Sequence, residues 1–341
     1  MKKILNCGFV ILMFVITIWI LVKSDDLSQI PRLFNSTNKY YLVLSVLCML
    51  GFWICDATII YNIKKMMNLK GNITKSLKLT MIGQYFSSIT PFATGGQPAQ
   101  VYSMVKDSIP VGKATSVLIN KFIVYQVVVT LYSIVMFILK ISFVYSRIRV
   151  ALPFVMTGII LNFAGLIIIS GLFFNDKIIK KVALFILNFL SLIKLVKNTQ
   201  KYKVKLDHHI SEYMCSIKKI IENKRMALRI ILITIIQLTF HFSITYFIYL
   251  ALDFKSATYL DIISIQSLLY MAVSFIPTPG TAGAAEGGFF ILFNVFFSSN
   301  VLMYAILLWR VISYYLNILV SGSVTIVDYI IRTKKKVVLE E

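Results

Sequence analysis

Charged residues are scarce in this sequence: they occupy 14% of its 341 positions, against 58% for hydrophobic residues. Soluble domains carry about 25% charged residues, and no stretch between the apolar segments is long and polar enough to form such a domain. The scarcity therefore excludes a soluble catalytic domain. The mean hydropathy of +0.81 also excludes disordered and fibrous classes and indicates an integral membrane protein.

Cysteine and histidine are also few, with four and three copies. The cysteines are scattered along the chain, so they predict neither a disulfide framework nor a C-x-x-C metal site. His208 and His209 lie in the basic segment 175–229, where an amphipathic helix along the membrane surface is favoured over a metal site. We predict no metal and no cofactor.

Acidic residues number only 14 against 35 basic ones, which gives a net charge of +21. A membrane span needs about 20 apolar residues. Six segments meet this length, and two further apolar segments are interrupted near their centres by Pro and Gly. The six spans are 4–22, 40–62, 115–139, 150–174, 230–252 and 302–328, and the interrupted segments are 79–104 and 259–297.

The basic residues are unevenly distributed between the two sides that these spans define. The two chain ends and alternate loops hold 26 of them, whereas the opposite loops hold seven. Because basic residues are retained in the cytoplasm, both termini are predicted to be cytoplasmic in a multi-pass protein of the cell membrane. The excess of basic residues is thus explained by membrane topology and by attraction to anionic lipid head groups. It does not require a nucleic acid, and we predict no nucleic-acid partner. Each interrupted segment must then enter and leave on one side, as a re-entrant helical hairpin.

The order of spans and hairpins repeats with opposite orientation in the two halves, about 1–140 and 150–330, followed by a basic cytoplasmic tail, 331–341. The fold class is therefore an all-α membrane protein of six full spans and two re-entrant hairpins in an inverted repeat. The hairpin turns begin Thr90-Pro91 and Thr278-Pro279. Gln97 precedes Lys121 and Glu286 precedes Arg310 by the same 24 residues, and a tyrosine, Tyr125 or Tyr314, follows each base after four more.

Inverted repeats with broken helices are the architecture of secondary transporters, in which substrate binds between the repeats. The turn glycines Gly95, Gly96 and Gly283 would expose backbone N–H groups at the start of a half-helix, a place that suits a lipid phosphate. The alternative is that these glycines only permit tight turns and close helix packing.

Four charged residues lie within apolar segments, where each costs about 2.5–3.5 kcal/mol to insert. Asp56 and Lys121 are predicted at similar depth near the cytoplasmic side, and Glu286 and Arg310 near the outer side, so each couple can pair. One interpretation is two buried ion pairs that lock the fold. The other is that Lys121 and Arg310 receive a phosphate while the carboxylates hold them or exchange partners. The predicted substrate-binding set is Gly95, Gly96, Gln97, Lys121, Tyr125, Gly283, Glu286, Arg310 and Tyr314, with Asp56–Lys121 also a structural pair and no catalytic residue.

Three segments carry a resemblance to a known family: Ile89–Pro98, Ile276–Gly287 and Trp309–Tyr315. They resemble the lysylphosphatidylglycerol synthase transmembrane region, which includes the flippase half of the multiple peptide resistance factor and stand-alone bacterial and archaeal relatives. Many relatives have a Gly-Glu-x-x-Arg pattern after the first turn. This chain has Gly96-Gln97-Pro98-Ala99-Gln100 there, with one acid and one base fewer.

The resemblance implies transfer of aminoacylated phosphatidylglycerol between leaflets and resistance to cationic peptides. We therefore expect a bacterial lipid translocase for an anionic or aminoacylated phospholipid or a lipid-linked head group, with a separate cytoplasmic lipid-modifying synthase as a further candidate partner. Two alternatives stay open, a phosphatidylglycerol lysyltransferase, as the family name suggests, and a protein handling polyprenyl-linked sugars. A third is a regulatory or scaffolding membrane subunit, which only the basic segment 175–229 supports.

Overall fold

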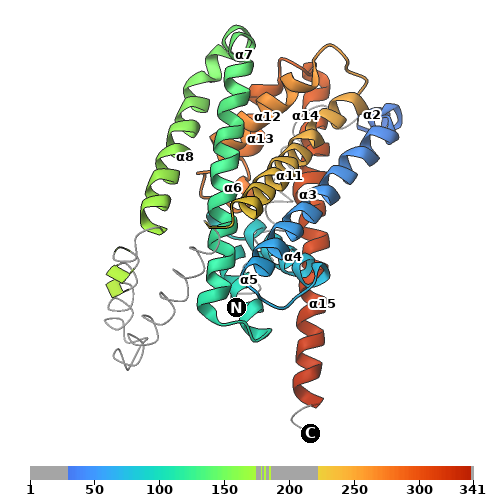
Figure 1. Cartoon of the computed structure of the whole chain (residues 1–341). Helices are drawn as coiled ribbons and strands as arrows, with labels where there is room; N and C mark the ends of the chain where they lie inside the picture. The colour runs from blue at the N-terminus through green and yellow to red at the C-terminus, as the bar shows by residue number, and fades with distance from the viewer. Residues whose placement is uncertain (1–29, 174–177, 179, 182–183, 186–221, 339–341) are drawn as a thin grey trace.

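The structure is a computed structural model that describes residues 30–173, 178, 180–181, 184–185 and 222–338. Within these residues every regular element is helical (Figure 1), so the all-α prediction is confirmed for them. The predicted span 4–22 and most of the basic segment 175–229 lie outside the described residues. The elements are α2 (Ile30–Ser36), α3 (Lys39–Met66), α4 (Ile73–Ser88), η2 (Pro91–Ala93), α5 (Gly96–Lys106), α6 (Val111–Leu139), α7 (Ile141–Arg147), η3 (Arg149–Ala151), α8 (Leu152–Phe173), α11 (Lys224–Ala251), α12 (Tyr259–Val273), η4 (Pro279–Thr281), α13 (Ala284–Phe293), α14 (Ser299–Arg310), the π-helix η5 (Val311–Tyr315) and α15 (Leu316–Val338).

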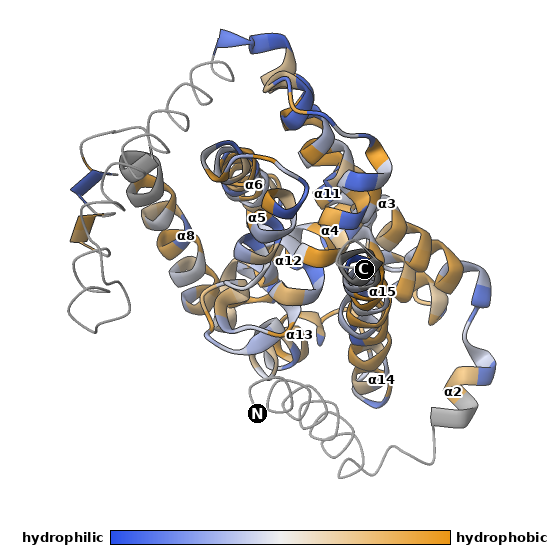
Figure 2. Ribbon diagram, turned by 90° about the horizontal axis from the view of Figure 1, so that it is seen from below, coloured by the Kyte–Doolittle hydropathy of each residue, from blue (hydrophilic) through white to orange (hydrophobic). Residues whose placement is uncertain are grey.

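Four described helices are long and apolar enough to cross a membrane: α3, α6, α11 and the continuous column α14–η5–α15, which qualifies over Ser299–Thr333. The predicted span 150–174 is helical as α8, and its apolar part, Leu152–Ile167, is shorter than the other four. Large apolar side chains stay exposed along these helices, as at Ile54, Leu131 and Leu319, and Figure 2 shows long orange stretches on α3. Such a surface suits lipid rather than water.

Both interrupted segments fold as two helices joined by a short 3₁₀ turn at the Thr-Pro sequence. The first, α4–η2–α5, starts at an N-cap where Asn72 Oδ1 accepts the backbone N–H of Lys75 at 2.9 Å. The second, α12–η4–α13, starts at a capping box, in which Thr258 and Asp261 bond each other's backbone N–H. These caps satisfy N–H groups that a helix start leaves open, so both helix starts are encoded locally.

The helices pack crosswise between the two halves of the chain. The long helices α3 and α11 lie along each other, α4 packs on α15, and α12 packs on α6. In Figure 1, α4 and α5 lie toward the end of the molecule that carries the C-terminus, whereas α12 and α13 lie toward the other end. The turns η2 and η4 are in contact. The two helix–turn–helix segments therefore approach from opposite ends and meet at their turns.

Ion pairs tie the base of each helix–turn–helix segment to a helix of the other half. Lys78 of α4 pairs with Asp328 of α15 at 2.8 Å. Arg332, one turn further along α15, pairs with both Asp328 and Asp107 at the end of α5, at 2.7 and 2.9 Å. At the opposite end, Lys140 after α6 pairs with Asp261 in the first turn of α12 at 2.8 Å. We call these contacts the base clamps.

Candidate functional site

The two turns share one backbone conformation, as their sequences predict. Thr90 and Thr278 are extended, with φ, ψ of −119°, 145° and −106°, 143°. Phe92 and Gly280 are both left-handed, at 53°, 18° and 60°, 21°. The next residues, Ala93 and Thr281, are also left-handed, with φ of 54° and 53°. The likeness of the two halves is therefore structural as well as sequential at these positions.

Gly280 is required by a close approach as well as by its backbone angle. A side-chain carbon at this position would overlap the ring of Tyr314, which lies in the π-helix immediately after α14. The hydroxyl of Tyr314 donates to the backbone carbonyl of Ser88 at 3.1 Å, at the end of α4. Tyr314 thus lies between the second turn and the last residue of α4, and links the two segments.

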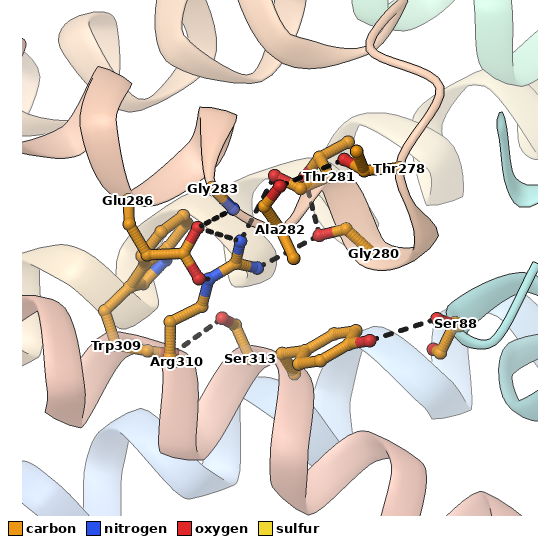
Figure 3. A network of polar contacts seen from close by, with 11 residues as sticks. Ser88, Thr278, Gly280, Thr281, Ala282, Gly283, Glu286, Trp309, Arg310 and Ser313 are labelled. Carbon is orange, nitrogen blue, oxygen red and sulfur yellow. Dashed lines mark hydrogen bonds and ion pairs between the residues drawn. The ribbon is translucent and has the colours of Figure 1, made fainter. Parts of the chain in front are cut away.

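Arg310 and Glu286 form a bidentate ion pair beside the second turn (Figure 3). Arg310 Nε lies 2.7 Å from Glu286 Oε1, and Nη2 lies 2.8 Å from Oε2. The guanidinium also donates to the turn carbonyls of Gly280 and Thr281, at 3.2 and 3.4 Å. The side chain of Arg310 is only 5% exposed, whereas that of Glu286 is 22% exposed. The base is therefore held by protein acceptors, and the acid is the more accessible partner.

Asp56 is the centre of a second buried cluster, between α3, α4, α6 and α11. Its Oδ2 accepts from Lys121 Nζ at 2.6 Å and from Thr80 Oγ1 at 2.8 Å, and its Oδ1 accepts from Gln237 Nε2 at 3.0 Å. The side chain of Asp56 is 3% exposed and that of Lys121 18%. Three donors compensate the buried carboxylate, as a buried charge requires.

Asn317 connects α3, α4 and α15 between these clusters. Its Oδ1 accepts from the indole N–H of Trp53 at 2.9 Å, and its Nδ2 donates to Ser88 Oγ at 3.2 Å and to Gln84 Oε1 at 3.3 Å. Ser88 also supplies the carbonyl that Tyr314 binds. A chain of polar side chains therefore runs along the face that α4 shares with the last membrane column.

The turn glycines are already engaged. The Gly95 N–H donates to Thr90 Oγ1 at 2.8 Å, and the Gly283 N–H donates to Glu286 Oε2 at 2.7 Å. Gly96 is buried, and a side-chain carbon there would overlap Ser87 and the carbonyl of Gly83 on α4. A phosphate would have to displace these hydrogen bonds to reach the N–H groups of Gly95 and Gly283. Gly96, by contrast, permits the close packing of α5 on α4.

Equal sequence spacing does not give equal contacts in the two halves. Arg310 pairs with Glu286, 24 residues earlier, whereas Lys121 pairs with Asp56, and Gln97 is exposed outside both clusters. Tyr314 binds the Ser88 carbonyl, whereas the Tyr125 hydroxyl meets that of Tyr270 at 2.9 Å. The two bases therefore share a sequence spacing but not the kind of partner that this spacing suggests.

Sequence reasoning missed four polar residues that the structure brings to these clusters: Thr80, Gln237, His241 and Tyr270. Gln237 and His241 lie one turn apart in the apolar run of α11, where an uncharged polar side chain needs a partner as a charge does. A charged residue in an apolar segment needs a reason to lie there, and asking the same of Gln and His would have identified Gln237 and His241.

The helices and their exposed apolar faces define a multi-pass helical membrane protein with polar contacts where two broken segments meet. The chain belongs to the family described as the lysylphosphatidylglycerol synthase TM region, which matches residues 6–321. The resemblance seen in the sequence is thereby confirmed. A UPF0104 membrane protein of Archaeoglobus fulgidus is 25% identical over 300 residues, which cover 87% of this chain and 89% of that protein.

Proposed function

We propose that this protein is a lipid translocase of the cell membrane, which moves an anionic or aminoacylated phospholipid or a lipid-linked head group between leaflets. In this proposal the chain has six spans, two re-entrant hairpins and cytoplasmic termini, and its halves form an inverted repeat. The observation that carries the proposal is the meeting of turns η2 and η4 from opposite ends of the molecule. Transporters built in this way bind substrate at such a meeting point.

The charged clusters support a site for a lipid head group. Charge at membrane depth is expensive and marks functional sites by default. Arg310 and Glu286 lie beside the second turn, and Lys121 and Asp56 lie between α3 and α6. Since each base is paired with an acid, the proposed step is an exchange of partners, in which a head-group phosphate takes the place of a carboxylate. Peptide resistance would follow if the lipid moved is aminoacylated.

Leaflet exchange in proteoliposomes tests this function. Vesicles would carry a fluorescent phosphatidylglycerol, and a membrane-impermeant quencher would report the fraction in the outer leaflet. We expect the wild-type protein to accelerate exchange, and Lys121→Ala and Arg310→Ala to reduce it at least about tenfold, because each removes a buried base. The matched control is Lys255→Ala, which breaks a Lys–Asp pair that is 76% and 82% exposed.

Competition identifies the class of lipid. Unlabelled phosphatidylglycerol, lysyl-phosphatidylglycerol and a polyprenyl phosphate would each be added in excess, and the lipid that slows the fluorescent probe most is the preferred substrate. Wild-type vesicles that exchange lipid no faster than empty ones would overturn the proposed function. A control variant as defective as Lys121→Ala would overturn the assignment of the site to the buried bases.

A further inference from the structure

The two buried clusters carry no net charge. Lys121 faces Asp56 and Arg310 faces Glu286, one base to one acid in each cluster. If the proposed function holds, an anionic lipid brings one negative charge into this region. Placing an unbalanced charge in a low-dielectric site is strongly unfavourable. The described interior therefore needs one further positive charge when the lipid binds, and none when the lipid is zwitterionic.

A connected group of six polar residues, which we call the polar ring, offers a place for that charge. Asp56 binds both Lys121 and Gln237. Gln237 and His241 are four residues apart and thus share one face of α11. The His241 ring stands nearly perpendicular to that of Tyr270, at 82° and 6.1 Å, and Tyr270 meets Tyr125, one turn after Lys121 on α6. The polar ring is thus Asp56, Gln237, His241, Tyr270, Tyr125 and Lys121.

Two buried acceptors in the polar ring have no partner. Gln237 Oε1 and His241 Nδ1 lie on adjacent turns of α11, and neither receives a hydrogen bond from any described residue. Buried polar atoms are satisfied in the great majority of cases, so each exception needs an explanation. The third such atom, Trp309 Nε1, is a donor and cannot accept a proton. Of the three, His241 alone can both accept a proton and become a cation.

We infer that His241 takes up one proton when an anionic lipid binds, so that lipid and proton occupy the protein together. The proton comes from water and binds Nδ1, and the imidazole becomes an imidazolium. No other bond forms or breaks. The new cation lies one turn from Gln237, whose amide donates to Asp56. It balances, within the polar ring, the negative charge that the lipid brings.

The titratable group in contact with His241 is Tyr270 of α12, and its other ring neighbours are Phe52 of α3 and Phe242 of α11. On the other helices that pack on α11, the charged groups of the two clusters are already paired: Asp56 of α3 binds Lys121 of α6, and Arg310 of α14 binds Glu286. His241 as a whole residue is half-buried, whereas its Nδ1 atom is fully buried.

Calorimetric titration tests the inference with purified full-length protein. Short-chain phosphatidylglycerol and phosphatidylcholine with the same acyl chains would be titrated in two buffers of different ionisation enthalpy, which yields the number of protons taken up on binding. We expect about one proton for phosphatidylglycerol and about none for phosphatidylcholine, because binding is linked to protonation only when the ligand adds charge. His241→Gln should bind phosphatidylglycerol more weakly and without proton uptake.

The matched control replaces the other two histidines, His208 and His209, by Gln and should keep the proton uptake. Binding of phosphatidylglycerol to the wild type without proton uptake overturns the inference and leaves the proposed function intact; proton uptake retained in His241→Gln does the same. Failure of phosphatidylglycerol to bind overturns both the inference and an anionic phospholipid as the substrate of the proposed function, whether or not phosphatidylcholine binds. The wild-type comparison of the two lipids does not depend on a variant that folds.

Discussion

The guanidinium of Arg310 contacts a carboxylate, two turn carbonyls and the rings of Trp309 and Tyr314, the rings at 5.1 and 5.3 Å. Removing Glu286 leaves this cation buried without its counter-charge. Breaking a buried pair on one side typically costs about 3–5 kcal/mol.

We therefore expect Glu286→Gln and Arg310→Gln to destabilise the protein strongly, and the double variant to lose much less than the sum. Thermal unfolding of the three variants in mild detergent measures this double-mutant cycle. Additive losses would show that the two residues do not interact.

Gly96 and Gly287 offer a matched test of glycine at the residue scale, because each lies in the half-helix after a turn. A side-chain carbon at Gly96 would overlap Ser87 and Gly83, whereas one at Gly287 meets nothing within 4 Å. We expect Gly96→Ala to cost about 1–3 kcal/mol through overpacking. Gly287→Ala should be neutral or stabilise by up to about 1 kcal/mol, since Ala favours the helix. Detergent unfolding would compare the two, and equal effects would refute the close packing at Gly96.

At the scale of elements, the base clamps fix how each helix–turn–helix segment sits on the other half. Asp328 accepts from two bases, Lys78 and Arg332, so its removal leaves Lys78 without its acid and Arg332 with Asp107 alone. Asp328→Asn should destabilise by about 1 kcal/mol or more, and the loss should shrink at high salt. Lys255→Ala, at an exposed pair, should have little effect. Unfolding at low and high salt measures both, and a salt-independent loss would rule out an electrostatic clamp.

The sequence predicts elements better than contacts. The Thr-Pro dipeptides predict the position of both turns, because Pro sets its own φ and ends the preceding helix. The equal depth of Asp56 and Lys121 predicts that they pair, and the two lie 2.6 Å apart. The 24-residue spacing from Gln97 to Lys121 gives no such contact, because Gln97 is exposed outside both clusters. The sequence Val311–Tyr315 carries no signal for the π-helix that it forms. Its residue Tyr314 contacts Gly280 and the Ser88 carbonyl, both far away in sequence.

At the scale of the whole molecule, the proposed topology can be tested by labelling single cysteines in a cysteine-free variant. Asn35 on α2 and Ser146 on α7 are exposed, and Figure 1 places α2 and α7 toward the end away from the C-terminus. We expect cysteines at these two positions to react from outside intact cells. Cysteines at Asn72, and at Gln200 outside the described residues, should react only after permeabilisation. Reaction of positions 72 and 146 from the same side would contradict the inverted repeat.

The π-helix Val311–Tyr315 adds a residue to the turn that follows Arg310, and this turn acts on everything after it. One residue corresponds to about 100° of rotation around a helix axis. Deleting Ser313 would let α14 and α15 run on as one regular helix, but it would turn Asn317 and Asp328 away from α4 while Arg310 kept its place. The length of this turn thus sets the rotation of α14, whose Arg310 binds Glu286, relative to α15, whose Asn317 and Asp328 bind α4.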